Sequence, residues 1–204
     1  MMRLVIFLLA LCPALFAAER PNIVLIFADD LGYGDLGCFG STKIKTPHLD
    51  KMAAEGLRLT SFYAQAVCGP SRAALMTGCY PIRIGEPGNK KNQHTVMHPK
   101  EITMAEVLRE AGYATACIGK WHLGEHAKDS PTGFDPATMP NGQGFDYFYG
   151  TPLFNGATVN VNDSKFRSTI LRNEQVVTSA VESWDHITQD YTREALDFIR
   201  QQRE

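Results

Sequence analysis

One run of residues, 22–28, constrains the fold of this chain more than any other feature. Its sequence, Asn-Ile-Val-Leu-Ile-Phe-Ala, is almost wholly apolar and rich in β-branched residues, without the polar alternation of a half-exposed strand. Such a run is typical of a strand buried on both faces of a parallel sheet covered by helices. It ends at Asp29 and Asp30. The sequence therefore predicts a strand here and an α/β protein with a mainly parallel sheet flanked by helices.

Helix and strand signals alternate along the rest of the chain. Two helices are expected to begin at threonines, because Thr46 precedes a first-turn proline and Thr103 opens a capping box with Glu106. A glycine ends each of them, and strand character follows. The expected elements are helices over 46–56, 103–112 and 187–200, strands over 57–64 and 113–118, and an irregular loop over 130–144. This alternation also favours the α/β class.

Residues 1–18 have the layout of a secretory signal peptide. Arg3 precedes an apolar core over 4–11, and small residues follow near Ala17 and Ala18, where cleavage is expected. A buried amino-terminal strand is the alternative, but a second strand-like run follows at once, and the apolar core is too short to span a bilayer. We therefore expect a secreted or periplasmic protein, or a lysosomal one in a eukaryote, with no membrane span after cleavage.

Charge and cysteine content exclude several classes of protein. The 204-residue chain has 20 Lys and Arg against 22 Asp and Glu, a formal net charge of −2. No overall field recruits nucleic acid or an anionic membrane, so any anion specificity is local. Removal of the leader leaves Cys38, Cys68, Cys79 and Cys117. We do not expect them to form a disulfide framework, because a chain of this size builds a core without covalent links.

Three groups of residues with reactive or charged side chains follow expected strands. They are Asp29 with Asp30, the run 68–72 with its cysteine, and Lys120 with His122. In parallel α/β sheets, ligands bind beyond the carboxyl ends of the strands, so these groups are expected to converge. The adjacent carboxylates offer hard oxygen ligands for Ca²⁺ or Mg²⁺. An ordinary acidic loop or helix cap is the alternative for this pair alone.

Cys68 and Arg72 lie at the expected start of a helix. Cys68 comes just before Pro70, so free backbone N–H groups and the helix dipole would face an anion at this point. Arg72 adds planar donors that suit an oxyanion. A buried structural cysteine beside a surface arginine is one alternative, and a thiolate phosphatase is another. The phosphatase is disfavoured because such enzymes place a longer glycine-rich loop between the two residues.

Two competing motifs carry less weight. Residues 32–37 match the glycine pattern of dinucleotide-binding folds, but the acidic pair intervenes after the strand and no helix follows to cap a pyrophosphate. His122 and His126 match an inverted zinc-peptidase pattern. That chemistry needs both histidines on one helix, and Gly124 after a strand argues against it.

Three separated motifs together resemble the type I sulfatases, arylsulfatase-like and formylglycine-dependent members of the alkaline phosphatase superfamily. The pattern Cys-x-Pro-Ser-Arg-x-x-x-x-Thr-Gly of these enzymes is found at 68–78. Their second signature, Gly-Tyr-x-Thr and then Gly-Lys-Trp-His-Leu-Gly, is found at 112–115 and 119–124. Their opening strand with its Asp-Asp pair corresponds to 22–30. The motifs occur in the family's order, so chance does not explain the match.

The resemblance implies a modified nucleophile. A formylglycine-generating enzyme would oxidise Cys68 to formylglycine (3-oxoalanine), and one hydroxyl of its hydrate would attack the sulfur of a sulfate ester to give a covalent sulfo-enzyme. Arg72 would neutralise charge at the hydrate, and Lys120 would bind a sulfate oxygen. His122 would exchange a proton with the hydrate during sulfate elimination.

The resemblance also implies a bound metal and a longer protein. Asp29, Asp30 and the modified residue 68 would hold Ca²⁺, with Mg²⁺ as the alternative. Residues 19–204 would form the amino-terminal part of a sulfatase catalytic domain, and we expect this part alone to be inactive. The substrate would be a sulfated small molecule or a sulfated glycan. A phosphate or phosphonate monoesterase on the same scaffold and a truncated, non-catalytic binder of sulfated glycans remain as alternatives.

Overall fold

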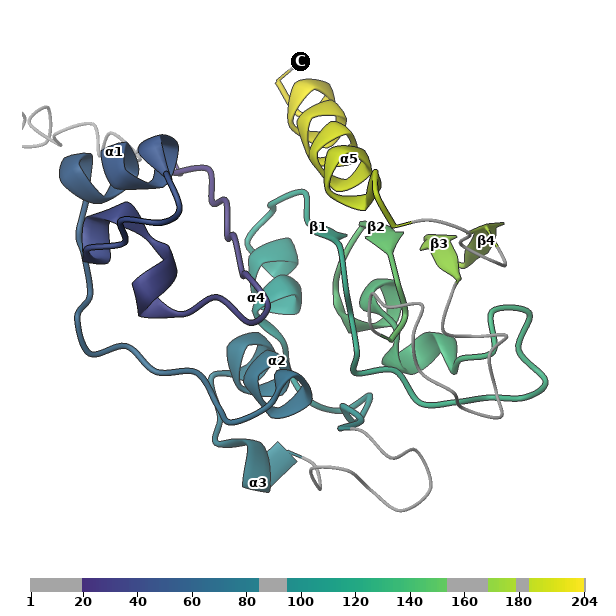
Figure 1. Ribbon diagram of the computed structural model, residues 1–204. Helices are drawn as coiled ribbons and strands as arrows, with labels where there is room; N and C mark the ends of the chain where they lie inside the picture. Colours follow the sequence, from purple (N-terminus) through teal and green to yellow (C-terminus); the bar gives the residue numbers. More distant parts are fainter. Residues whose placement is uncertain (1–19, 85–94, 154–168, 179–183, 204) are drawn as a thin grey trace, which may run out of the picture. The chain divides into compact units, whose positions relative to one another are not determined.

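The computed structural model describes residues 20–84, 95–153, 169–178 and 184–203 (Figure 1). The predicted signal peptide over 1–18 lies outside the described residues. The chain divides into two compact units, one ending at Arg58 and the other beginning at Leu59. Each unit is described by itself below.

The first unit contains two short 3₁₀ turns, Tyr33–Asp35 and Gly37–Phe39, and helix α1, Pro47–Glu55. The α1 helix confirms the helix expected over 46–56, with Pro47 in its first turn and Gly56 after its last residue. Asp50, in the first turn of α1, ties the helix to the preceding turn. Its carboxylate accepts hydrogen bonds from the backbone N–H of Cys38 at 2.6 Å and from the Thr46 hydroxyl at 3.0 Å.

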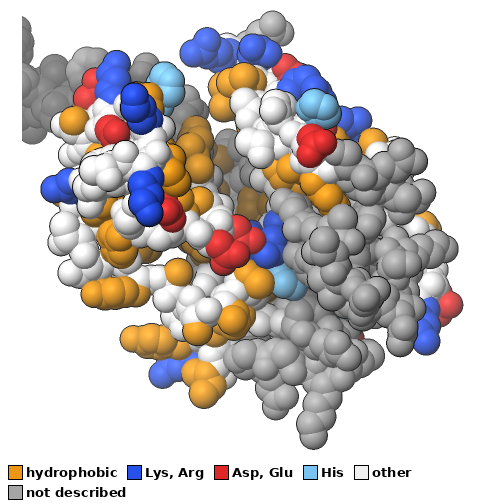
Figure 2. All heavy atoms as spheres, viewed as in Figure 1, with side chains coloured by type: hydrophobic (Ala, Val, Ile, Leu, Met, Phe, Trp, Pro, Cys, Tyr) orange, Lys and Arg blue, Asp and Glu red, His pale blue; other side chains and the backbone are white. Residues whose placement is uncertain are grey.

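The strands predicted over 22–28 and 57–64 are not present. Both segments have no regular secondary structure, and side chains within them are exposed, with Ile26 at 73% and Leu57 at 84%. Hydrophobic side chains can be seen at the surface of the molecule (Figure 2). The predictions are wrong because apolar, β-branched composition favours burial in a sheet but does not supply a neighbouring strand. A strand also needs a second strand to bond with, and no strand in the described ranges pairs with either segment.

The second unit holds a four-stranded sheet in the order β1-β2-β3-β4. The strands are β1 Ala116–Ile118, β2 Tyr147–Gly150, β3 Ile170–Arg172 and β4 Gln175–Thr178. Strand β1 pairs with β2 in parallel, whereas the pairs β2–β3 and β3–β4 are antiparallel. The described sheet is therefore mixed where a mainly parallel one was expected. The short turn at Asn173 and Glu174 allows only an antiparallel hairpin between β3 and β4, because a parallel pair needs a long crossover.

Helices and 3₁₀ turns surround this sheet, and the predicted α/β class is confirmed. They are α2 Cys68–Thr77, α3 Pro81–Ile84, α4 Met104–Glu110, η3 Pro136–Thr138, η4 Pro140–Gln143 and α5 Ile187–Gln201. The loop expected over 130–144 contains the two 3₁₀ turns η3 and η4. The helix expected over 187–200 is confirmed as α5. No helix within the described ranges is both long and apolar enough to cross a membrane.

Helix α4 and strand β1 follow the sequence signals closely. The capping box is present, because Thr103 Oγ1 accepts a hydrogen bond from the backbone N–H of Glu106 at 3.2 Å and Glu106 accepts one from the N–H of Thr103 at 2.8 Å. Strand β1 is shorter than the predicted 113–118, since the N–H of Tyr113 still bonds to the carbonyl of Leu108 in α4 at 3.0 Å. The first residues of the predicted strand therefore close the helix.

The core of the second unit lies between the sheet and the loop that joins β1 to β2. Its buried side chains include Trp121, Leu123, Phe134, Phe148 and Leu171. Trp121 is only 2% exposed, and its indole N–H donates to the carbonyl of Thr138 at 2.9 Å. The residues on either side of His122 are thus anchored in the core.

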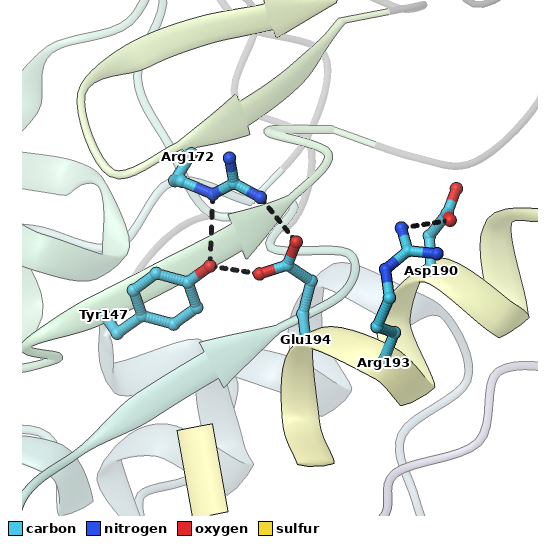
Figure 3. Close-up of polar contacts among 5 residues, drawn as sticks. All are labelled: Tyr147, Arg172, Asp190, Arg193 and Glu194. Carbon is cyan, nitrogen blue, oxygen red and sulfur yellow. Dashed lines mark hydrogen bonds and ion pairs between the residues drawn. The ribbon is translucent and has the colours of Figure 1, made fainter. Parts of the chain in front are cut away.

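Helix α5 is fastened to the sheet by three polar side chains (Figure 3). The hydroxyl of Tyr147 in β2 donates to the carboxylate of Glu194 in α5. Arg172 in β3 donates to the Tyr147 oxygen at 3.2 Å and pairs with Glu194 at 2.5 Å. Burial raises the pKa of Tyr147, and the hydrogen bond to Glu194 raises it further. Phe198 of the same helix stacks on the Tyr147 ring.

Candidate active site

Cys68 is the first residue of α2, where the chain changes from extended to helical backbone. Val67 before it has φ −142° and ψ 164°, and its side chain does not cap the helix. Ser71 holds this transition in place. Its hydroxyl accepts a hydrogen bond from the N–H of Gln65 at 3.0 Å and donates one to the carbonyl of Val67 at 2.9 Å. The serine of the 68–78 motif therefore fixes the approach to the cysteine, and the helix dipole is directed at this point.

The end of the same motif forms the end of the helix. Thr77 donates its hydroxyl hydrogen to the carbonyl of Ala73 at 2.8 Å. Gly78 follows with φ 67°, a left-handed conformation that favours glycine, and its N–H bonds to the carbonyl of Ala74 at 2.8 Å. The motif thus specifies one complete helix with both of its termini.

Lys120 and His122 lie directly after β1, in a segment that continues to bond with the β2 side. The N–H of Gly119 donates to the carbonyl of Tyr149 at 2.9 Å, and the N–H of His122 donates to the carbonyl of Pro152 at 3.0 Å. His122 has φ 63°, which is uncommon for a residue with a side chain and costs on the order of 1–3 kcal/mol. The surrounding backbone bonds and the buried neighbours of His122 hold it in this conformation.

A close approach of two glycines allows the strand ends to meet. A Cβ atom added at Gly150 would overlap the carbonyl oxygen of Gly119. Gly119 itself has φ 119°, a conformation that side chains disfavour. Both positions therefore require glycine for the chain to turn into Lys120 as it does.

Thr115 and Asp146 tie the start of β1 to the start of β2. The Asp146 carboxylate accepts hydrogen bonds from the N–H of Thr115 at 2.9 Å and from its hydroxyl at 3.1 Å. The N–H of Asp146 in turn donates to the Thr115 hydroxyl oxygen at 3.0 Å. The threonine of the 112–115 motif, which directly precedes β1, is thus joined to the residue before β2.

The structure brings together the predicted residues of the second unit. Cys68 Sγ lies 3.3 Å from Nδ1 of His122. Arg72, one turn further along α2, donates from Nη1 to the backbone carbonyl of Lys120 at 2.6 Å. Two direct contacts therefore link the start of α2 to the segment after β1. The individual chemical roles of these residues remain predictions.

Asp29 and Asp30 belong to the first unit, where they follow the extended segment 22–28. Both are exposed, and Asp30 has φ 57°. Two adjacent carboxylates form an oxygen donor set of the kind that Ca²⁺ or Mg²⁺ accepts. Within the described residues, no group of three or more His, Cys, Asp or Glu side chains is able to hold a metal ion. A joint metal site of Asp29, Asp30 and residue 68 therefore remains a prediction.

Cys117, in β1, packs against the hydrophobic core. Burial raises the pKa of the Cys117 thiol to about 12, although the charge of Arg72 acts in the opposite direction. Cys117 therefore stays protonated at neutral pH and is a poor nucleophile. Cys68 is half-buried at a helix start, and Cys38, Cys68, Cys79 and Cys117 are all free thiols.

Sequence analysis did not identify Thr95 as a neighbour of the site. Its side chain packs against Gly69, the residue after Cys68. Thr95 lies outside every motif and outside every helix or strand of the described chain, so no periodic pattern or cap signals its burial. Only the tertiary contact reveals it.

Comparison with known proteins is consistent with this geometry. A family model described as "Sulfatase" matches residues 21–204. The chain is 51% identical to human arylsulfatase A, over 71% of this chain and 28% of that protein. It is 47% identical to an N-acetylgalactosamine-6-O-sulfatase of Bacteroides thetaiotaomicron, over 66% of this chain and 27% of that protein. The chain thus spans less than a third of the length of these two relatives.

A solved structure named Ps i-CgsB has a similar fold. It matches with a TM-score of 0.69 and 31% identity, over 90% of this chain and 42% of that one. The same protein is also solved in complex with k-i-k-neocarrahexaose, and that structure matches with a TM-score of 0.65 and 30% identity over the same shares of the two chains.

Proposed function

Since this chain belongs to the sulfatase family, we propose that its protein hydrolyses sulfate esters with a formylglycine formed from Cys68 as the nucleophile. The observation that carries the proposal is the 3.3 Å contact between Cys68 Sγ and His122 Nδ1 at the start of α2. The sulfur atom occupies the place of an oxygen of the modified residue. An imidazole nitrogen at this distance is within reach of a proton on that oxygen.

The modified residue supplies two geminal hydroxyls, one to attack sulfur and one whose deprotonation expels sulfate and restores the aldehyde. In this proposal, His122 Nδ1 takes the proton from the second hydroxyl. Arg72 presents its guanidinium at the first turn of α2 and offsets negative charge there. Lys120 binds a sulfate oxygen, and its backbone is positioned by the hydrogen bond that its carbonyl accepts from Arg72 at 2.6 Å.

A divalent metal is part of the proposal. Asp29, Asp30 and the modified residue 68 would hold it. The two aspartates offer adjacent, exposed carboxylates, whose hard oxygen donors suit Ca²⁺ better than they suit softer metal ions. When bound, the ion polarises sulfate oxygens as a Lewis acid. Calcium takes six to eight oxygen ligands, so other groups must complete the coordination. Mg²⁺ is the alternative ion.

A sulfated glycan is the proposed substrate class, with a sulfated small molecule as the alternative. One relative is named for a sulfated amino sugar, and one similar structure holds an oligosaccharide. The proposal also includes export to the periplasm or the cell exterior, or to the lysosome in a eukaryote. A formylglycine-generating enzyme is then the required partner during maturation.

Mass spectrometry of the peptide that spans residue 68 tests the proposal directly. The full gene product is made in its own host or with a formylglycine-generating enzyme, and the peptide is expected to carry the aldehyde in place of the thiol. Turnover of an aryl sulfate and of an aryl phosphate is then compared, with Cys68→Ala as the inactive control. Faster phosphate turnover would favour a phosphate or phosphonate monoesterase. Sulfated-glycan binding without turnover of either ester would favour a non-catalytic binder.

A further inference from the structure

Thr95 is buried against the first turn of α2. Its residue surface is only 2% exposed. A Cβ atom built on Gly69 would lie 2.8 Å from Thr95 Oγ1 and 3.0 Å from Thr95 Cβ. Real side chains do not approach so closely, so the threonine occupies the space that any other residue at position 69 would need. Thr95 therefore packs directly on the backbone of the residue that follows Cys68.

The contact between Thr95 and Gly69 lies toward the N-terminus of α2, where residue 68 is located. Cα–Cβ bonds in a helix tilt toward its N-terminus, so the Thr95 side chain lies on the N-terminal side of Gly69. Ser71 fixes the chain that enters the helix, through Gln65 and Val67. Thr95 supports the same turn from a different segment of the chain.

The segment of Thr95 also holds the residues around His122. The N–H of Met97, two positions further on, donates to the carbonyl of Leu123 at 3.0 Å. Met97 is only 1% exposed and belongs to the same core cluster as Leu123. Residues 95–97 thus contact a neighbour of Cys68 at one end and a neighbour of His122 at the other.

The Thr95 hydroxyl is not what holds the turn. Oγ1 is buried and has no hydrogen-bond partner in the described chain. A buried hydroxyl without a partner costs stability, because the water it loses is not replaced. The shape of the β-branched side chain must therefore provide the contact with Gly69. Valine has almost the same shape without the hydroxyl, which separates the two properties experimentally.

We propose that Thr95 is a positioning residue of this site: by packing on Gly69, it sets the approach of the side chain at position 68 to His122. The inference rests on the proposed function, in which these two side chains act together. Thr95, which lies outside the motifs, would thus help to hold residue 68 and His122 together.

The test uses the full gene product made without a formylglycine-generating enzyme, so that residue 68 remains cysteine. Alkylation of Cys68 by iodoacetamide is followed by mass spectrometry of its peptide, which separates it from the other free cysteines. His122→Gln is expected to slow this alkylation roughly tenfold, because the imidazole, 3.3 Å from the sulfur, acts as a general base for the thiol as it attacks. In the Thr95→Ala background, the same substitution is expected to change the rate by less than about twofold, since the pair is no longer held together.

Thr95→Val is the matched variant. It is expected to keep the roughly tenfold effect of His122→Gln, and to raise the denaturant midpoint of the protein because the unpaired hydroxyl is gone. If His122→Gln slowed alkylation equally in wild type and in Thr95→Ala, the proposal would be overturned. It would also be overturned if His122→Gln no longer slowed alkylation in Thr95→Val. If Thr95→Ala does not fold, Thr95→Ser replaces it and is expected to give an intermediate effect. Failure of residue 68 to be converted in the mass-spectrometric experiment above would instead contradict the proposed function, without affecting the thiol measurement.

Discussion

Cys68 and His122 are 54 positions apart in the chain, yet their side chains lie 3.3 Å from each other. The contact depends on two local structures that the sequence motifs encode. One is the start of α2, fixed by Ser71, and the other is the turn after β1, where His122 adopts a left-handed conformation with φ 63°. Because neither side chain needs to move to meet the other, this arrangement suits the proton transfer proposed for His122.

Substitution of His122 by alanine is expected to slow the release of sulfate from the modified enzyme. The loss in turnover should be about 10²–10⁴-fold, the usual contribution of a positioned acid–base group. Stopped-flow measurement of alcohol release from an aryl sulfate should show a burst of one equivalent followed by slow turnover. A variant with unchanged turnover and no burst would show that another group takes this proton.

Replacement of Arg72 by lysine is expected to lower activity at least tenfold, although the charge is kept. The arginine donates to the Lys120 carbonyl at 2.6 Å, and the planar guanidinium has further donors that a single ammonium group does not reproduce. The ratio kcat/KM with an aryl sulfate measures the loss. Arg109→Lys, at an exposed position in α4, is the matched control and is expected to leave kcat/KM unchanged. Equal effects of the two substitutions would contradict a specific role for Arg72.

A methyl group at position 150 is expected to destabilise the second unit. In Gly150→Ala, the new Cβ overlaps the Gly119 carbonyl oxygen, and the backbone must shift to relieve the clash. Overpacking of this kind typically costs about 1–3 kcal/mol, which denaturant unfolding followed by circular dichroism detects. Gly34→Ala is the control, since a Cβ there meets no atom of the described chain within 4 Å. Similar unfolding midpoints for the two variants would argue against a close approach of the strand ends.

The attachment of α5 is expected to weaken in alkaline solution. Burial and the Glu194 carboxylate raise the pKa of Tyr147 above its ordinary value of 10.0. The folded protein thus binds this proton more tightly than the unfolded chain does. The stabilisation that comes from this tighter proton binding at Tyr147 is fully present below pH 10.0. It is lost as the pH rises through the raised pKa of Tyr147 in the folded state.

Denaturant unfolding of wild type and Tyr147→Phe at pH values on both sides of 10.0 measures this effect. The variant is expected to lose less stability than wild type over the alkaline interval. Tyr80→Phe is the control, because Tyr80 is 74% exposed. The same alkaline loss in wild type and Tyr147→Phe would contradict the prediction.

Local sequence signals predicted helix starts better than they predicted the sheet. The capping residues of α4, the helix start near Cys68 and the placement of Lys120 after β1 depend on local signals, and the structure contains all three. Strands β2, β3 and β4 were not predicted, because runs of three or four residues are too short to display a period. The run 22–28 has the composition of a buried strand, but no strand of the described chain pairs with it.

Local sequence patterns also could not predict the contacts between segments that are distant in the chain. Nothing in the sequence around Thr95 indicates that it packs on Gly69, since the contact depends on how two loops meet. The hydrogen bond from Arg72 to the Lys120 carbonyl is a similar case. The motifs predicted that Cys68 and His122 would approach each other, but not which backbone atoms would hold them.

The Thr115–Asp146 hydrogen bonds have a consequence for how this protein can diversify. They tie the start of β1 to the start of β2, and the parallel pairing of the two strands extends this attachment, so the strands stay together whatever the length of the chain that connects them. Loop-closure entropy grows slowly, by about 0.6 kcal/mol for each doubling of loop length. Insertions and deletions in the outer part of the connection, around Lys128 and Asp129, are therefore inexpensive. That part can vary in length while Lys120 and His122 keep their places, because the backbone of residues 119–122 is hydrogen-bonded to the β2 side.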